Sequence, residues 1–440
     1  MSSGGMTPLR RLFAAFAAVV SIAAAQPDTL DHIADDYVQL MLRIGEADPG
    51  FVDAYYGPPE WAAAAKTAPH DLPTLKAETA DLRARLDRIR PDDPQLRQRA
   101  DFLRGQLRAA AMRLRIVAGE KPGFLVEARE QFGTAPELKP LSDYDPILAR
   151  IETLVPGPGT LATRVDAFQN RFNIPDAKLR PALDAGIAEC RRRTIAHIRL
   201  PANEEFELAL VKDKPWSGYN YYQGNAKSRI EINTDLPIRA SRVVDLGCHE
   251  GYPGHHVYNA LLEQKLSRGR GWREFTVYPL YSPQSLIAEG SANYGIRLAF
   301  PGNDQVDFNR RTLFPQIGLP PAEAKRYFEL NEAMRDLAGA RFTITADYLD
   351  GKIDKAEAIR LTQKYSLVSP ERAAQSIRFA DTYRAYVINY GLGEDMVKAY
   401  VESAGPSQDA RWQRMEQLLS NPMTPADLVP AAPQPKGERG

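Results

Sequence analysis

The chain has 440 residues and a mass of 49.0 kDa, with 44% hydrophobic and 25% charged residues. These proportions are close to those of an average globular protein, and they exclude a disordered polymer and a multispan membrane protein. Lysine and arginine together number 56, as do aspartate and glutamate, so no net charge favours binding to nucleic acid. The length predicts about two to three domains with a sizeable buried core.

Residues 1–25 have the pattern of a secretory signal peptide. Arg10 and Arg11 precede the apolar run 12–25, which ends in three alanines before Gln26. The run is shorter than the roughly 20 apolar residues that span a bilayer, so an uncleaved anchor is the less favoured alternative. The segment predicts a periplasmic or secreted protein without a stable membrane span after cleavage.

Residues 26–200 are predicted to form an N-terminal helical region. Apolar residues recur at spacings of three and four in 75–86 and in 96–117, with charged residues between them. After Pro201 the period changes to two in 206–210 and 230–232, which predicts strands joined by a turn in the aromatic segment 216–224.

Helical periodicity returns later in the region 201–420, which carries the candidate chemistry. Ser282-Pro283 and Ser369-Pro370 are typical helix starts, and Asp354 with Glu357 resembles a capping box. Residues 421–440 are rich in proline and alanine and are expected to form a disordered tail. The fold class predicted is therefore mostly α with a small antiparallel β-sheet.

Two cysteines, Cys190 and Cys248, are present. They are too few for a disulfide framework, and either a bridge or two structural thiols agrees with the sequence.

The segment from Cys248 to His256 holds three of the six histidines of the chain, namely His249, His255 and His256. A hydrolytic zinc site needs about three protein ligands and one open position, and imidazole is a good ligand. On an unbroken helix His255 is rotated about 600° from His249, and His256 lies about 10.5 Å further along the axis, so neither shares an ion with His249. The intervening Pro253-Gly254 predicts a break that brings His255, with His256 as the alternative, to the metal.

Glu250 follows the first histidine and is predicted to face the metal-bound water and to act as its general base. The best candidate for a third ligand is Glu289, which lies on a predicted helix of small and apolar residues where an unpaired charge is costly. Asn293 follows one turn later and is placed to orient a ligand.

The two motifs resemble those of a bacterial family catalogued as domain of unknown function 885, which is grouped with gluzincin-type zinc metallopeptidases. The first motif, HExxPGHH, corresponds to residues 249–256, and the EGxAxY-like motif corresponds to residues 289–294. The resemblance covers roughly residues 205–400. It implies zinc bound by His249, His255 and Glu289.

The resemblance further implies Glu250 as catalytic base and a gluzincin-like architecture. In that architecture an edge strand, for which residues 229–235 are the candidate, pairs with an extended peptide. Relatives tend to carry Pro-Gly-Gln-Ala before a tyrosine near the C-terminus, where this chain has Tyr383, Arg384 and Ala385 before Tyr386.

We therefore expect an exported zinc metallopeptidase acting on a peptide or small amide substrate, with oligomeric state open. Zinc is expected to polarise the scissile carbonyl and to acidify its water, with Glu250 taking the proton. Tyr390 and Arg384 are candidates to stabilise the oxyanion, and Tyr386 and Tyr383 are not excluded. The alternatives are a non-catalytic metal-containing binding protein and a zinc hydrolase of non-peptide amides or esters.

Overall fold

The computed structural model describes Met1 and residues 28–214 and 216–429. The predicted signal peptide therefore lies outside the described residues. Helices dominate the described chain, with two small sheets, so the predicted mostly helical fold class is confirmed.

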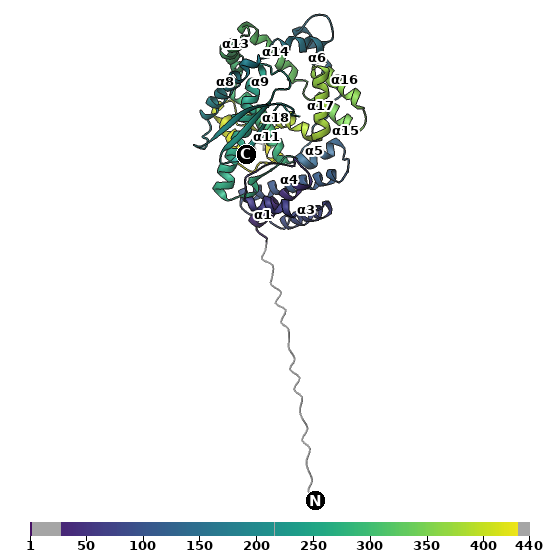
Figure 1. Ribbon diagram of the computed structural model, residues 1–440, viewed down its shortest axis with the longest axis vertical. Helices are drawn as coiled ribbons and strands as arrows, with labels where there is room; N and C mark the ends of the chain where they lie inside the picture. The colour runs from purple at the N-terminus through teal and green to yellow at the C-terminus, as the bar shows by residue number, and fades with distance from the viewer. Residues whose placement is uncertain (2–27, 215, 430–440) are drawn as a thin grey trace, which may run out of the picture.

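The first helices of the chain lie together at one end of the molecule, with α1, α3 and α4 there, whereas α6 and α8 lie toward the other end (Figure 1). The predicted helices at 75–86 and 96–117 are confirmed as α3 (Leu72–Leu86) and α4 (Pro94–Val117). Each begins where an aspartate accepts hydrogen bonds from free backbone N–H groups, namely Asp71 for α3 and Asp93 for α4. The other helices up to residue 200 are α1 (Leu30–Ala47), α2 (Pro59–Thr67), α5 (Phe124–Phe132), α6 (Asp145–Leu154), α7 (Leu161–Asn170) and α8 (Asp176–Ile195).

The expected helix starts in the second half of the chain are also present. Helix α11 (Pro283–Ala299) begins after Ser282, α16 (Lys355–Ser366) is capped by Asp354, and α17 (Pro370–Tyr383) is capped by Ser369. The other α-helices there are α9 (Ser241–Leu246), α10 (His255–Leu262), α12 (Asp304–Phe308), α13 (Phe314–Ile317), α14 (Ala324–Arg335), α15 (Ala340–Leu349), α18 (Ile388–Glu402) and α19 (Gln408–Leu419).

The larger sheet has three strands in the order β2 (Glu205–Val211), β4 (Lys227–Asn233) and β3 (Gly218–Gly224). The pair β3–β4 is antiparallel, as expected, whereas β2 runs parallel to β4. The segment expected as a turn, 216–224, is mostly strand β3, because its alternating tyrosines suit a pleated surface. A second antiparallel pair joins β1 (Val52–Tyr55) to β5 (Val277–Pro279).

Two hydrophobic cores are built from both halves of the chain. One core packs α1, α3, α4 and α5 against α10, α11, α18 and α19. The other packs α6, α7 and α8 against β2, β4 and α13–α17. The boundary expected near residue 200 therefore does not coincide with a boundary in the packing.

The first part of the expected disordered tail is ordered. Residues 425–428 form a 3-10 turn, η8 (Pro425–Leu428), in which Leu428 is fully buried and Thr424 shares hydrogen bonds with Asp427. The expectation was wrong for 421–429, because two apolar side chains there, Met423 and Leu428, join the first core. Residues 430–440 lie outside the described residues.

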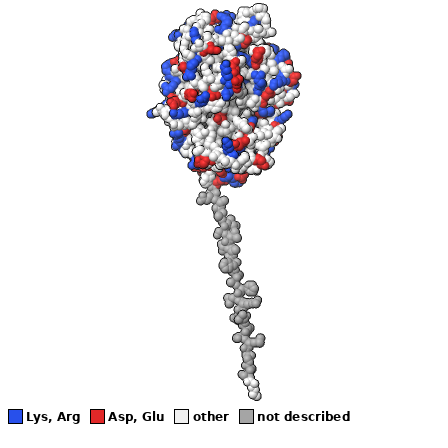
Figure 2. Space-filling view, viewed as in Figure 1, with Lys and Arg blue, Asp and Glu red and all other residues white. Residues whose placement is uncertain are grey.

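Basic and acidic side chains are interspersed over the face shown in Figure 2, in keeping with the equal numbers of the two signs. Among the described helices, none has the length and apolar character needed to cross a membrane.

Candidate metal centre

The histidine motif lies at a break between two helical segments. Helix α9 continues into a π-helical turn, η2 (Gly247–Gly251), the chain then turns through 252–254, and α10 begins at His255. Gly254 makes the turn possible, since a Cβ atom there would lie 1.7 Å from the carbonyl oxygen of His249. The predicted interruption at Pro253-Gly254 is thus present, and His249 and His255 stand on its two sides.

His249, His255 and Glu289 converge on one point. The Nε2 atoms of the two histidines are 3.1 Å apart, and Glu289 Oε2 lies 3.1 Å from His249 Nε2 and 3.7 Å from His255 Nε2. Two ligand atoms that share a tetrahedral zinc ion at about 2.0–2.1 Å are about 3.3 Å apart. The three predicted ligand atoms therefore have the spacing of a zinc site.

A hydrogen-bonded chain fixes the orientation of the His249 ring. Asn293 Nδ2 donates to the backbone carbonyl oxygen of Tyr390 at 2.8 Å, which leaves Asn293 Oδ1 facing His249 Nδ1 at 2.9 Å. Because an amide oxygen only accepts, Nδ1 carries the proton and Nε2 presents a lone pair. This is the arrangement that a metal-binding imidazole requires.

Glu289, on α11, has two different oxygen environments. Tyr386 donates its hydroxyl proton to Oε1 at 2.8 Å, whereas Oε2 is buried without a hydrogen bond from any described residue. Three candidate ligand atoms thus face one another; in the metal-free protein a proton on His255 offsets their repulsion, and a bound cation would do the same. The donor set of two imidazoles and one carboxylate suits zinc.

The charges of this cluster also act on its protonation. Burial of Glu289 opposes its ionisation, but the charges of His255 and His249 outweigh that effect and hold its pKa far below the usual range. Burial likewise opposes protonation of His255, but the carboxylates of Glu289, Glu250 and Asp53 together raise its pKa to about 9.

Glu250 lies in η2 with its side chain against strand β3. Its Oε1 atom would be 2.7 Å from a Cβ at Gly218, so this glycine leaves room for the carboxylate. Asn220, on β3, donates from Nδ2 to the backbone oxygen of Glu250 at 2.8 Å and holds the turn to the sheet. Among the described residues none forms a hydrogen bond or an ion pair with the Glu250 carboxylate, which lines the cavity and is available to accept a proton.

His256, the alternative ligand, faces away from the cluster. It is fully buried, with Nδ1 2.8 Å from Ser228 Oγ and Nε2 3.1 Å from Glu204 Oε2. Tyr252 donates to the same Glu204 oxygen at 2.6 Å. Both ring nitrogens of His256 are therefore occupied by the protein.

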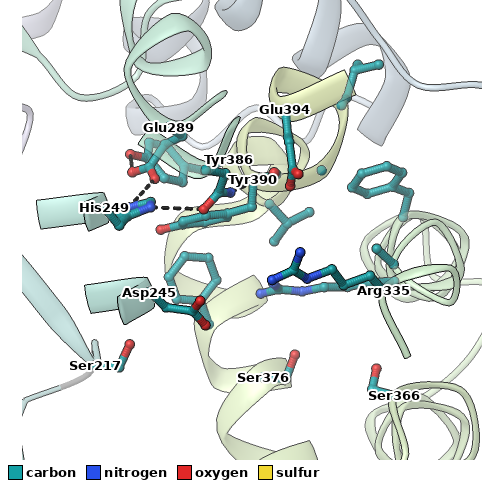
Figure 3. A pocket seen from close by; sticks show the side chains of 18 of the residues that line it. Ser217, Asp245, His249, Glu289, Arg335, Ser366, Ser376, Tyr386, Tyr390 and Glu394 are labelled. Carbon is teal, nitrogen blue, oxygen red and sulfur yellow. Dashed lines mark hydrogen bonds and ion pairs between the residues drawn. The ribbon is translucent and has the colours of Figure 1, made fainter. Parts of the chain in front are cut away.

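A cavity of about 1180 Å³ opens beside the cluster. Strand β3 and the α9–η2 segment line one part of it, and residues of α15, α17 and α18 line another. Figure 3 shows His249 and Glu289 beside the rings of Tyr386 and Tyr390, with Arg335 extending into the same pocket. Tyr390 and Tyr383, two of the expected candidates, both line it.

Arg384 is not part of the cavity, which corrects its candidacy as oxyanion stabiliser. Its guanidinium is 2.7 Å from the buried carboxylate of Glu127 on α5, because the left-handed backbone at Arg384 directs the chain toward that helix. The ion pair joins α5 to the 3-10 turn η7 (Arg384–Val387), and the guanidinium also donates to the backbone oxygen of Pro122 at 3.4 Å.

The edge strand beside the cavity is β3, not the expected segment 229–235. That segment forms most of β4, which is the central strand and is paired on both sides. Ser217 and residues 218–220 of β3 line the cavity, and the alternation in this strand could not be separated from turn chemistry in the sequence.

Two further cavity residues, Asp53 and Arg341, were missed. Asp53, on β1, has an Oδ1 atom buried without a hydrogen bond among the described residues; burial with the nearby Glu289 and Glu250 raises its pKa to about 7, against the charge of His255. No sequence signal links it to a motif about 200 residues away. Arg341 has apolar or uncharged residues at all four positions three and four away in the sequence, two of which precede its helix, and this is a signal of a cation without a local partner.

Cys190 and Cys248 form a disulfide, which settles the alternative that the sequence left open. The bridge ties α8 to η2 at the residue before His249.

Comparison with known proteins gives similarity at the level of fold. No protein-family model and no curated protein sequence matches the chain significantly. A candidate lipoprotein from Colwellia psychrerythraea has a similar fold, with a TM-score of 0.51 and 17% identity over 80% of this chain and 65% of that chain. The M32 carboxypeptidase of Deinococcus radiodurans R1 aligns with a TM-score of 0.40 and 15% identity over 91% of this chain and 92% of its own.

Proposed function

We propose that the protein is a zinc-dependent peptidase in which His249, His255 and Glu289 hold the metal. The observation that carries the proposal is the convergence of three candidate ligand atoms at 3.1 to 3.7 Å beside a large cavity. Bound zinc supplies Lewis-acid polarisation of a carbonyl and acidifies water. The resemblance of the two motifs to gluzincin-type metallopeptidases supports the same class.

Glu250 acts as the general base and acid. Its carboxylate accepts the proton of the attacking water and then passes it to the leaving nitrogen. The β3 backbone at Gly218 limits the positions that the carboxylate can take, so that it stays at the cavity wall. Such positioned proton transfer contributes about 10²- to 10⁴-fold to rate.

Tyr390 is the residue best placed to stabilise the oxyanion. Burial raises the pKa of its phenol well above the usual value, and the charges of Glu289 and Glu250 add to that effect. The hydroxyl is therefore protonated over the whole working range and remains a hydrogen-bond donor. Tyr386 already donates to Glu289 and is a positioning residue for that carboxylate.

The test is Glu250→Gln. We expect the variant to keep about one zinc per chain and to lose at least ~10²-fold in hydrolysis of a peptide library, because only the base is removed. Metal content by mass spectrometry and cleavage by chromatography measure the two quantities. Glu329→Gln, an exposed position on α14, is the control and keeps both.

Each alternative has its own result. Zinc in the wild type without hydrolysis of any amide or ester would indicate a binding protein. Hydrolysis confined to non-peptide amides or esters would indicate the other class of hydrolase.

We also propose export, on the basis of residues 1–25. A disulfide at Cys190 and Cys248 agrees with an oxidising compartment. The test is the mass of the protein recovered from the periplasmic or extracellular fraction. We expect a chain that begins at Gln26, whereas a full-length chain in the cytoplasm would contradict export.

A further inference from the structure

Of the five arginines that line the cavity, three are paired with carboxylates, one donates to a backbone oxygen, and one has no polar partner among the described residues. Arg242, Arg297 and Arg335 lie 3.4, 2.8 and 2.7 Å from carboxylates of Asp245, Glu394 and Glu332, in that order. Arg372 donates to the carbonyl oxygen of Pro237 at 3.5 Å. Within residues 28–214 and 216–429, Arg341 has neither an ion pair nor a hydrogen bond.

The surroundings of Arg341 are aromatic and apolar. Its guanidinium carbon lies 5.3 Å from the centre of the Phe379 ring, and Phe342 is the next residue on α15. The side chain is half-buried, and burial lowers the pKa of its guanidinium although the Tyr390 phenol opposes the effect. A partly desolvated charge of this kind is costly unless an anion pairs with it, and a guanidinium fork matches a carboxylate in two parallel hydrogen bonds.

Arg341 lies one aromatic layer away from the metal cluster. The Phe379 ring against which it rests is 6.1 Å from the Tyr390 ring and 6.5 Å from the Tyr386 ring. Tyr386 in turn donates to Glu289. Figure 3 shows these two tyrosines grouped with His249 and Glu289 on the same side of the pocket.

We infer that Arg341 binds the free α-carboxylate of a peptide substrate, so that the protein removes residues from the carboxyl end of peptides. The inference rests on the proposed peptidase function and specifies its substrate class. The charges of both Glu289 and Arg341 act on the Tyr390 phenol, so the phenol takes the oxyanion and the guanidinium takes a charge farther along the substrate.

The experiment compares matched peptides with blocked N-termini, each made as a free acid and as a C-terminal amide. Zinc-loaded wild type is expected to prefer the acid by about 10- to 100-fold in kcat/KM, the size of a charge-assisted pair. Arg341→Gln should remove that preference through KM for the acid and leave the amide nearly unchanged. Arg335→Gln, an arginine of the same cavity that is already paired, should keep the preference.

A binding measurement separates this inference from the proposed function. Zinc-loaded Glu250→Gln is titrated calorimetrically with the same acid and amide, with and without Arg341→Gln. Tighter binding of the acid that Arg341→Gln abolishes supports the inference even when no peptide is cleaved, whereas absence of cleavage by wild type counts against the proposed function alone.

Three results would overturn the inference. One is equal binding and cleavage of acid and amide by the wild type. Another is an equal loss of kcat on both peptides in Arg341→Gln, which would make the guanidinium an oxyanion donor. The third is a requirement for a free N-terminal amine, which would assign end recognition to an acidic residue such as Asp53 instead.

Discussion

His255 and His256 are neighbours in the sequence, yet their rings lie in different environments. The ring of His255 faces Glu289 and His249, whereas both nitrogens of His256 are held by Ser228 and Glu204 in the protein interior. Adjacent residues at the start of a helix point about 100° apart, so only one of the two can face the cluster. The break at Pro253-Gly254 decides which one it is.

This difference predicts opposite effects of two similar substitutions on zinc binding. His255→Ala should abolish stoichiometric zinc binding, since it removes one ligand, and should also lower the stability of the metal-free protein, because the buried Glu289 carboxylate loses a charged partner. His256→Ala should keep about one zinc per chain and lose about 2–4 kcal/mol of unfolding free energy, because Ser228 and the buried Glu204 lose a partner. Metal analysis and urea unfolding measure both, with His32→Ala on the exposed face of α1 as control. Zinc loss in His256→Ala but not in His255→Ala would reverse the assignment.

At the scale of elements, the small sheet positions the turn that carries Glu250. Strand β3 contacts η2 through Asn220 and Gly218, and its far end is held by Glu263 at the end of α10. The Glu263 carboxylate accepts hydrogen bonds from the backbone of Asn225 and Ala226 and from the Tyr222 hydroxyl. Both turn residues have positive φ, so the β3–β4 turn depends on that carboxylate.

Glu263 therefore predicts a pH-dependent contribution to stability. Burial alone would raise its pKa, but the hydrogen bonds from Tyr222, Asn225 and Ala226 outweigh burial and lower it. A lowered pKa in the folded state means that the contribution is complete above the unfolded value of about 4.3 and is lost as the pH falls through the folded value.

The variant Glu263→Gln should lose about 1–3 kcal/mol of unfolding free energy at pH 7 and less at pH 3, because below the unfolded pKa of about 4.3 the unfolded wild-type chain takes up a proton and the carboxylate contributes less to stability. Urea unfolding of the two proteins at pH 7, 5 and 3 measures the difference. A constant difference over this range would show that the carboxylate charge does not hold the turn.

For the whole molecule, the cluster of His249, His255 and Glu289 joins segments that are separate in the sequence. His249 and His255 flank the break before α10, Glu289 comes from α11, and Asn293 and Tyr386 connect the cluster to the start of α18. An ion bound only by the folded state adds its binding free energy to the stability.

Adding zinc to the metal-free protein at about 100 times the dissociation constant should therefore add about 2.7 kcal/mol to the stability and raise Tm by a few degrees. A chelator should reverse the shift. Differential scanning calorimetry measures it, and His255→Ala should show none. A shift of equal size in His255→Ala would place the stabilising ion elsewhere.

The local elements of the fold follow from local physics. Helix starts at Ser369 and Asp354 and the periodic segments of α3 and α4 depend on neighbours a few residues away, and the sequence predicts them correctly. Strand β3 was misassigned because aromatic residues with glycines suit both turns and strands. The choice was made by its pairing with β4, a non-local contact.

For the site, the amino-acid sequence alone determined the candidate ligands and the base, because a glycine-dependent break and a buried acid among small residues are visible in residues 249–256 and 289–293. The tertiary structure alone decided that His256 is occupied elsewhere, that Arg384 is paired with Glu127, and that Asp53 and Arg341 enter the cavity. The physical reason is distance along the chain. A side chain's partner can be read from spacing only when both lie within a few turns, whereas these partners come together through the packing of separate elements.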